Sequence, residues 1–371
     1  MTEQKADDAL KDKILFTYQW NVPPPSPNDD DDADEDDYKM ETMITSYNVT
    51  TMKWQLHLTD DHLNVRYQGI LVTDGICNIS YKLFCDNNME IELYSSPITS
   101  VVSSGQRWNT IFVTPDGFMD ELKDARKTGA VAKIVIIIAL LLPTKIFFRP
   151  FDLPLHPLNK IICEEYPKDM EKDFRFEFLN DSDFSIKCLD GTVPALKMVL
   201  NVSSKFMKKH FKESKENEFV CEHKIDVVKP LIIYLHSLCF QMPKTYDLDF
   251  VDRLLKAADF FDPVKKRQIF QSIHQSLCRK FVEELPDFEP ILQWLRIAFQ
   301  YNFFILSNMI CAIISNKFYF KWVEIFPENA RNTSNQLFHE IFGSESPYCT
   351  YIFASIESTF TGSLLTNVSF P

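Results

Sequence analysis

The sequence predicts a multidomain α+β protein, with a β-sandwich in its N-terminal part, an α/β domain after it and helices toward the C-terminus. Three observations support this fold class. Short stretches of alternating polarity, separated by turn residues, fill residues 13–143. Residues 183–277 run in the order strand, strand, helix, helix, strand and further helices, and residues 292–313 carry apolar side chains at helical spacing. A chain of 371 residues with 45% apolar side chains accommodates two or three globular domains.

The first part of the chain is expected to form successive β-strands. Ile14, Phe16, Tyr18 and Trp20 alternate with other residues, as on a half-buried strand. After a long loop at residues 23–38, further extended segments are expected at residues 43–49, 54–58, 63–71, 79–83 and 89–93. The apolar run 130–142 is shorter than the roughly 20 residues that span a bilayer, and Pro143 ends it, so we interpret it as a buried strand. The pattern predicts a β-sandwich over residues 13–143, after a flexible N-terminus at residues 1–12.

Most of the net charge of −13 comes from one segment. Residues 29–37 carry eight carboxylates, and the other 44 acidic and 39 basic residues leave a balance of −5. A protein of this charge is not expected to bind nucleic acid, because that requires a clustered Lys/Arg face. The densest basic positions, Lys208-Lys209 and residues 265–267, are interpreted as solvated helix faces. The acidic segment is either a self-repelling loop or a site that attracts basic partners.

Cysteine usage and the first residues indicate a reducing compartment. The nine cysteines include no closely spaced pair, which favours free thiols over a disulfide framework. Residues 1–13 are polar and charged, without the apolar core of a secretory signal. We therefore expect a cytoplasmic or nuclear protein that does not insert into a membrane.

The segment 183–277 predicts an α/β domain. Phe184, Ile186 and Cys188 alternate, Asp190-Gly191 is a hairpin turn signal, and Val193 begins the return strand. Two helices follow, the second capped at Ser203-Ser204. A short strand at residues 219–221 and helices with Val227, Val228, Leu231, Leu254 and Leu255 on their apolar faces come next. Asp262-Pro263 is expected to start another helix, as N-cap and first helical residue.

These residues resemble the BTB (POZ) domain. The Asp before the first strand is Asp183, the family's Ala-His-Lys-x-x-Leu is similar to residues 195–200, its Ser-x-x-Phe-x-x-x-Phe to residues 204–211, and its Leu-x-Ala-Ala-Asp-x-Tyr to residues 255–261. Leu196 replaces the family histidine, and residues 238–240 replace its Tyr-Thr-Gly. The resemblance implies a BTB/POZ domain at residues 180–282 that forms homodimers through residues 169–179 and its first helix.

The N-terminal strands resemble a MATH (TRAF-like) domain. Its aromatic-x-Trp-x-Val strand is similar to residues 18–22, its Trp-x-Leu-x-Leu strand to residues 54–58, and its Trp-Gly-x-x-x-Phe-Ile segment in part to residues 108–113, where Asn109 replaces Gly. The MATH-like domain would occupy residues 13–143, with a connector at residues 144–179. The order MATH then BTB resembles the speckle-type POZ proteins, substrate-recruiting adaptors of cullin-based ubiquitin ligases.

This resemblance implies two sets of site residues. A shallow groove for target peptides would include Tyr81, Arg66 and Trp108, although each could equally be an ordinary sandwich residue. Cullin binding would use Met207, Phe211 and Glu213, where Phe211-Lys212-Glu213 has the family's hydrophobic-x-Glu form, and Phe211 could instead serve the core. A target peptide, a cullin scaffold and a second copy of the chain are the implied partners.

The last part of the chain adds helices and a tail. Leu292, Leu295 and Ala298, then Leu306, Met309, Ile310 and Ile313, form two apolar stripes that predict a helical extension over residues 283–342, similar to the paired helices that enlarge the cullin surface of MATH-BTB proteins. The tail at residues 343–371 is rich in Ser, Thr and aromatic residues and suggests no structure.

Catalysis and cofactors are not expected. The eight glycines form neither a dinucleotide fingerprint nor a phosphate loop, and Cys221 with His223 lacks a second pair at zinc-finger spacing. Two functions remain open: a ligase adaptor, and a BTB-dimerised scaffold that gathers MATH-bound partners without a cullin. The altered hydrophobic-x-Glu loop and the replaced family residues favour the scaffold more than the domain order does.

Overall fold

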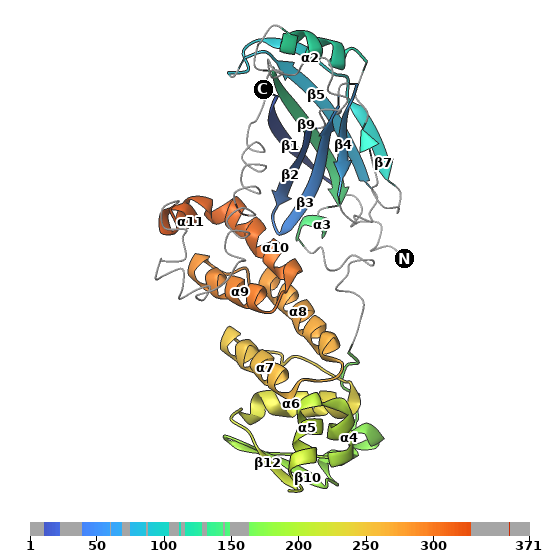
Figure 1. Cartoon of the computed structure of the whole chain (residues 1–371), viewed down its shortest axis with the longest axis vertical. Helices are drawn as coiled ribbons and strands as arrows, with labels where there is room; N and C mark the ends of the chain where they lie inside the picture. The colour runs from blue at the N-terminus through green and yellow to red at the C-terminus, as the bar shows by residue number, and fades with distance from the viewer. Residues whose placement is uncertain are drawn as a thin grey trace. The chain divides into compact units, whose positions relative to one another are not determined.

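The computed structural model (Figure 1) describes a subset of the chain, which forms two compact units. One unit comprises residues 1–153 and 307–371, and the other comprises residues 154–306. The described residues within them are 11–22, 39–59, 61–68, 75–86, 88–103, 111–112, 116–127, 132–143, 145–148, 163–327 and 356.

The first unit contains two β-sheets. One has the strand order β1-β9-β5-β6, with β7 also paired to β5, and the other has the order β2-β3-β4-β8. Their bounds are β1 Lys11–Val22, β2 Lys39–Tyr47, β3 Thr50–Leu58, β4 Leu63–Tyr67, β5 Gly75–Phe84, β6 Glu92–Ser95, β7 Thr99–Ser103, β8 Ile111–Phe112 and β9 Ala132–Pro143. The apolar run near residue 140 is therefore a strand. It pairs along its whole length with β1, from Lys11 opposite Pro143 to Val22 opposite Ala132.

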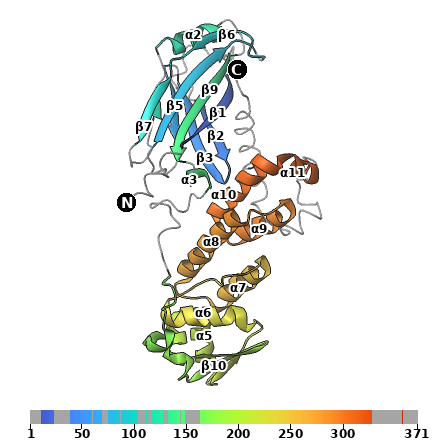
Figure 2. The same cartoon turned by 180° about the vertical axis from the view of Figure 1, so that it is seen from behind.

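Alternation along the strands builds one core between the two sheets. Every second residue of β3 and β5 is fully or almost fully buried, and the same cluster includes residues of β4, β9 and β1. Trp54 lies at its centre, where its indole Nε1 donates a hydrogen bond of 3.0 Å to Thr45 Oγ1. Helix α2, Phe118–Lys127, lies at one end of the sandwich and α3, Lys145–Phe148, near the other (Figure 2), and both contribute to the core.

One expected strand is displaced by a turn. The segment predicted at residues 89–93 forms β6 only from Glu92 onward. The Asp86 carboxylate accepts hydrogen bonds from the amides of Glu90 and Ile91, and these bonds hold Glu90 and Ile91 against Asp86 and lower the pKa of Asp86. Side-chain capture of backbone amides thus overrides the alternating pattern at this point.

The helices of the predicted C-terminal extension are divided between the two units. Helix α9, Phe288–Gln300, belongs to the second unit, whereas residues from Ser307 onward in α10, Phe304–Ile313, belong to the first. A π-helical turn at Ile314–Phe318 leads into α11, Tyr319–Ile325. Asn316 in this turn donates a hydrogen bond of 3.2 Å to Asn48 O and accepts one from Ser46 Oγ, so it contacts the turn between β2 and β3.

The second unit pairs a small sheet with helices. The sheet has the order β11-β10-β12, in which β10 and β12 are parallel. The helix α6 packs against both β11 and α7. The elements are β10 Phe184–Cys188, β11 Gly191–Ala195, β12 Glu218–Val220, α4 Lys197–Ser203, α5 Lys205–Glu213, α6 Ile225–Ser237, α7 Leu248–Phe261 and α8 Lys266–Glu283. The expected order of strands and helices is confirmed here.

The expected helix start at Asp262-Pro263 is wrong. Asp262 instead ends α7 in the left-handed conformation, with φ of 43°, and its amide donates to Ala258 O. Pro263 forms an isolated bridge with Ser204, and α8 begins only at Lys266. Aspartate tolerates the left-handed region, so the same residue type can end one helix as readily as it starts the next.

No helix among the described residues is long and apolar enough to cross a membrane.

Candidate protein-interaction site

The N-terminus of α4 is held by two side chains from other elements. Leu196 is its N-cap residue and has no side-chain acceptor. Asp183 Oδ1 accepts the Lys197 amide at 2.7 Å, and His236 Nε2 accepts the Leu196 amide at 2.9 Å. The first amides of a helix lack partners within the helix, so these two side chains replace a local cap. Asp183, which precedes β10, therefore has a structural role at the start of α4.

His236 is neutral in this arrangement. Its Nδ1 lies 2.8 Å from Ile232 O, an acceptor, so Nδ1 carries the proton and Nε2 is free to accept from Leu196. The ring stacks on Phe178 with centroids 4.0 Å apart. Burial lowers the pKa of His236 to about 4. The histidine therefore joins α6 to α4 only while it is uncharged.

Ser204 joins α5 to the end of α7. Its hydroxyl accepts the Met207 amide at 3.0 Å as the N-cap of α5 and donates to Phe261 O at 2.5 Å. Ser204 is 1% exposed. The expected cap is confirmed, and the same oxygen also satisfies a carbonyl at the C-terminus of α7.

The three predicted cullin-binding residues lie on α5 at different depths. Met207 is fully buried, so the structure assigns it to the core, in place of the contact surface that the resemblance implies. Phe211 is half-buried, with its ring edge-on to Phe184 at 5.1 Å and Lys197 Nζ 5.3 Å from its centroid. Glu213 is exposed at the end of the helix. Only Glu213 presents its side chain mainly to solvent.

The loop after α5 is fixed to α4. Lys197 Nζ donates to Glu216 O at 2.8 Å and to Lys215 O at 3.4 Å. These bonds span residues 215–217, between Glu213 and β12, and hold the loop next to Phe211. Lys197 therefore orders the surface around Glu213. A single sequence offers no signal for this contact, because its acceptors are backbone carbonyls.

The predicted groove residues do not form one surface among the described residues. Arg66 is exposed on β4, opposite Gln55 of β3. Tyr81 is fully buried on β5, next to the Phe118 ring at 5.8 Å, and belongs to the core of the sandwich instead of a solvent-facing groove. Trp108 lies outside the described residues. Inward alternation along β5 explains Tyr81, because Ile79 and Leu83 on the same face are also fully buried.

The buried hydroxyl of Tyr81 leads to a stability prediction. It has no hydrogen-bond partner in the described part of the chain, and burial raises its pKa. Replacing Tyr81 by Phe removes an unsatisfied polar group at nearly constant volume, so we expect unchanged stability or a gain of up to about 1 kcal/mol. Urea unfolding followed by tryptophan fluorescence measures it, and a loss above about 1 kcal/mol would assign the hydroxyl a partner.

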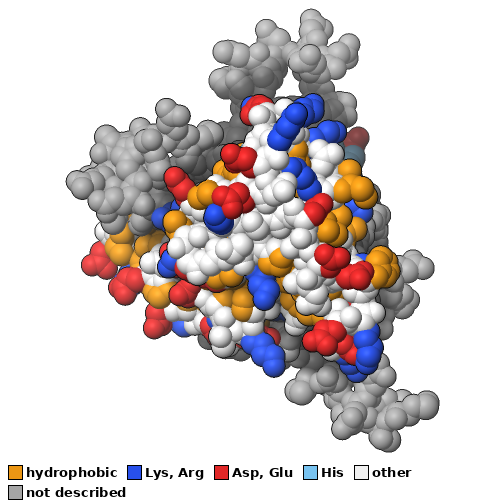
Figure 3. All heavy atoms as spheres, turned by 90° about the horizontal axis from the view of Figure 1, so that it is seen from below, with side chains coloured by type: hydrophobic (Ala, Val, Ile, Leu, Met, Phe, Trp, Pro, Cys, Tyr) orange, Lys and Arg blue, Asp and Glu red, His pale blue; other side chains and the backbone are white. Residues whose placement is uncertain are grey.

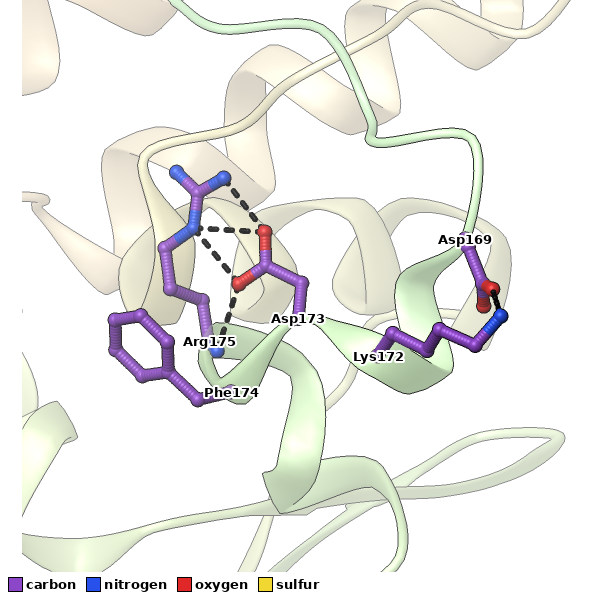
Figure 4. Close-up of a pocket in the computed structure, with 5 residues that line it drawn as sticks. All are labelled: Asp169, Lys172, Asp173, Phe174 and Arg175. Carbon is purple, nitrogen blue, oxygen red and sulfur yellow. Dashed lines mark hydrogen bonds and ion pairs between the residues drawn. The ribbon is translucent and has the colours of Figure 1, made fainter.

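An ion cluster and an exposed phenylalanine precede β10, the first strand of the second unit. Two short 3₁₀ helices, Met170–Lys172 and Phe174–Leu179, line an open hollow (Figure 4). Arg175 binds Asp173 with contacts of 2.8–3.2 Å, and its other terminal nitrogen reaches Glu164. Asp173 also caps the second 3₁₀ helix. Phe174 is 83% exposed, so a rigid ionic support presents an apolar side chain to solvent.

The face of the second unit that carries β10 and β12 has a mixed surface. In Figure 3, hydrophobic, basic and acidic side chains intersperse over the described atoms, without one broad field of a single charge. A nucleic-acid surface would require a concentrated basic field.

Comparison with known proteins identifies the second unit. The family model described as BTB/POZ domain matches residues 176–279. Residues 176–279 form a BTB/POZ domain. Among solved structures, the BTB domain of human gigaxonin matches 29% of this chain and 80% of that chain, at 17% identity and a TM-score of 0.21. No curated protein matches the sequence.

The BTB domain supports a role in protein interaction and adaptor assembly. Its recognisable residues are explained by the contacts above: Asp183 and Ser204 satisfy helix ends, and the buried Ala257, Ala258 and Phe261 pack α7. The contacts of His236 and Lys197 were not anticipated, since neither forms a local motif.

Proposed function

We propose that this protein is an adaptor that recruits target proteins to a cullin-RING ubiquitin ligase in the cytoplasm or nucleus. The observation that carries the proposal is Glu213, the last residue of α5, which is exposed beside the half-buried Phe211 and a loop held by Lys197. An acidic side chain next to a partly accessible aromatic ring on a rigid helix end suits a protein contact with an apolar centre and a polar rim.

The N-terminal sandwich would supply the second contact in this proposal. An extended peptide can add its backbone to the open edge of a sheet while its side chains enter apolar notches. The exposed Arg66 lies on β4, which is next to the short edge strand β8 of its sheet. An arginine there would favour a peptide with an acidic residue. This is the role that resemblance to a MATH domain would give the unit.

A dimer would join two such adaptors. Phe174, Met198 and Val202 are exposed by 83%, 77% and 66%, in the segment before β10 and in α4. Burying these side chains against a second copy would remove apolar surface from water. Two peptide sites in one particle then raise the effective concentration of the second contact.

The decisive variant is Glu213→Ala. The Glu213 side chain is exposed and makes no hydrogen bond or ion pair within the described residues, so its removal should leave the fold intact. We expect at least about tenfold weaker binding to a cullin N-terminal domain, equivalent to about 1.4 kcal/mol. Isothermal calorimetry with the purified full chain measures it. Glu283→Ala, an exposed glutamate of α8, is the matched control and should bind as the wild type does.

Phe211→Ala is a less discriminating variant. Its ring contacts Phe184 and Lys197, so its loss removes packing as well as the proposed partner contact.

The second candidate function is a scaffold without a cullin, and the burial of Met207 favours it, because one implied contact residue is unavailable to a partner. Absence of binding by wild type at micromolar concentrations would select the scaffold.

A further inference from the structure

Two cysteines of the BTB domain lie side by side on neighbouring strands. Cys188 is the last residue of β10, and Cys221 directly follows β12. The parallel register pairs Lys187 with Val220, so the next residues of the two strands are these cysteines. The Cys221 amide donates to Lys187 O at 2.9 Å, which continues the ladder. The Sγ atoms are 4.0 Å apart.

The two thiols differ in access. Cys188 is half-buried, whereas Cys221 is 3% exposed. Each sulfur also lies near a backbone carbonyl, Ile186 O for Cys188 and His223 O for Cys221. Solvent therefore reaches the pair through Cys188, and Cys221 lies behind it.

We propose that Cys188 and Cys221 form a thiol–disulfide site that takes a two-electron oxidant of the peroxide class. Cys188 Sγ attacks one peroxide oxygen, the O–O bond breaks, and the products are a sulfenic acid and water. Cys221 Sγ then attacks the Cys188 sulfur, the S–OH bond breaks, and the second water leaves with the Cys221 proton. In sum, two thiols and one hydrogen peroxide give one disulfide and two waters.

The backbone geometry permits this bond. Neighbouring strands lie about 4.8 Å apart, and disulfides join Cα atoms that are about 4.4–6.8 Å apart. The sulfurs must approach by about 2 Å to reach bonding distance, which rotation of the Cys188 side chain can supply from its half-buried position. Neither strand has to move.

Resting reactivity is low at neutral pH. Burial, the neighbouring Cys221 and Asp190 raise the pKa of Cys188 to about 12. The thiolate is the reactive form, so the pair stays reduced without an added oxidant. Oxidation would join β12, a three-residue edge strand, to β10 at positions 33 apart in the sequence, and the intervening chain contains α4, α5 and the loop beside Glu213.

The test uses the folded full chain and hydrogen peroxide. After brief treatment, free thiols are alkylated and the protein is digested with trypsin without reduction. Cleavage after Lys187, Lys197, Lys215 and Lys224 leaves Cys188 and Cys221 as the single cysteines of two peptides. We expect these peptides to appear linked, with a mass about 2 Da below their sum, and to separate on addition of dithiothreitol.

Cysteine variants distinguish the formation of the sulfenic acid from the formation of the disulfide. Cys221→Ser should leave Cys188 as a sulfenic acid that dimedone traps, and Cys278→Ser, at a buried cysteine of α8, should leave the link unchanged. Amide exchange in β12 should slow by about tenfold or more on oxidation. The proposal is overturned if Cys188 links to another cysteine or another chain, or if both thiols remain free after other cysteines have been oxidised.

Discussion

Acidification from pH 7 to pH 4 should lower the free energy of unfolding of the BTB domain by up to about 3 kcal/mol through His236. Its pKa of about 4 in the folded protein lies below the ordinary 6.5. A histidine with a lowered pKa favours folding in its neutral form, so this stabilisation is complete above pH 6.5 and is lost as the pH falls toward 4. Protonation of Nε2 would replace its hydrogen bond from the Leu196 amide by two facing donors.

Met207 offers a domain-specific readout. It is fully buried in the BTB domain, and peroxide oxidises a methionine once unfolding exposes it. Mass spectrometry of the Met207 peptide over a urea series at each pH gives the unfolding midpoint of this domain within the full chain. Carboxylates protonate in the same range, so the comparison is with His236→Gln, which has an acceptor but does not titrate.

The His236→Gln variant should be less stable than the wild type at pH 7, by about 1–2 kcal/mol, because it loses the stack on Phe178. Its stability should fall less than that of the wild type between pH 6.5 and pH 4. His223, whose pKa burial also lowers, is present in both proteins and cancels in the difference. Equal losses in the two proteins would show that His236 is not the group responsible.

Short-range sequence patterns predicted much of the BTB fold. Alternation at Phe184 and Ile186, the Asp190-Gly191 turn and the Ser204 cap each act over a few residues, and the structure contains all three. Asp262-Pro263 misled because the Asp262 amide belongs to the preceding helix. An aspartate between two helices fits the sequence pattern of a helix end as well as that of a helix start.

Site residues were harder to predict, because a motif position does not specify which way its side chain points. Tyr81 and Met207 occupy expected positions, yet both side chains are fully buried. The contact of His236 with Leu196 joins residues 40 apart, and that of Lys197 with Glu216 joins a side chain to a carbonyl. Such contacts cannot be predicted from local sequence. The exposure of Glu213, in contrast, follows from its position at the end of a helix.

Replacing Ser204 by Ala should destabilise the BTB domain by about 2–3 kcal/mol. The substitution leaves the buried Met207 amide without its acceptor and Phe261 O without its donor, at a position that is 1% exposed. Water cannot easily replace either bond there, so the cost exceeds that of a solvent-exposed cap. The urea midpoint of Met207 oxidation in the full chain measures it.

Ser203→Ala is the matched control, one residue earlier. The Ser203 hydroxyl donates to Val199 O within its own helix and is half-buried, so this bond is local and its loss should change stability by less than about 0.5 kcal/mol. Ser204→Thr, which retains the hydroxyl, should recover part of the loss if its methyl group fits. Both variants remove one hydroxyl, but only Ser204→Ala removes the hydrogen bonds that link α5 to α7. Equal effects of Ser203→Ala and Ser204→Ala would therefore contradict a special role of Ser204.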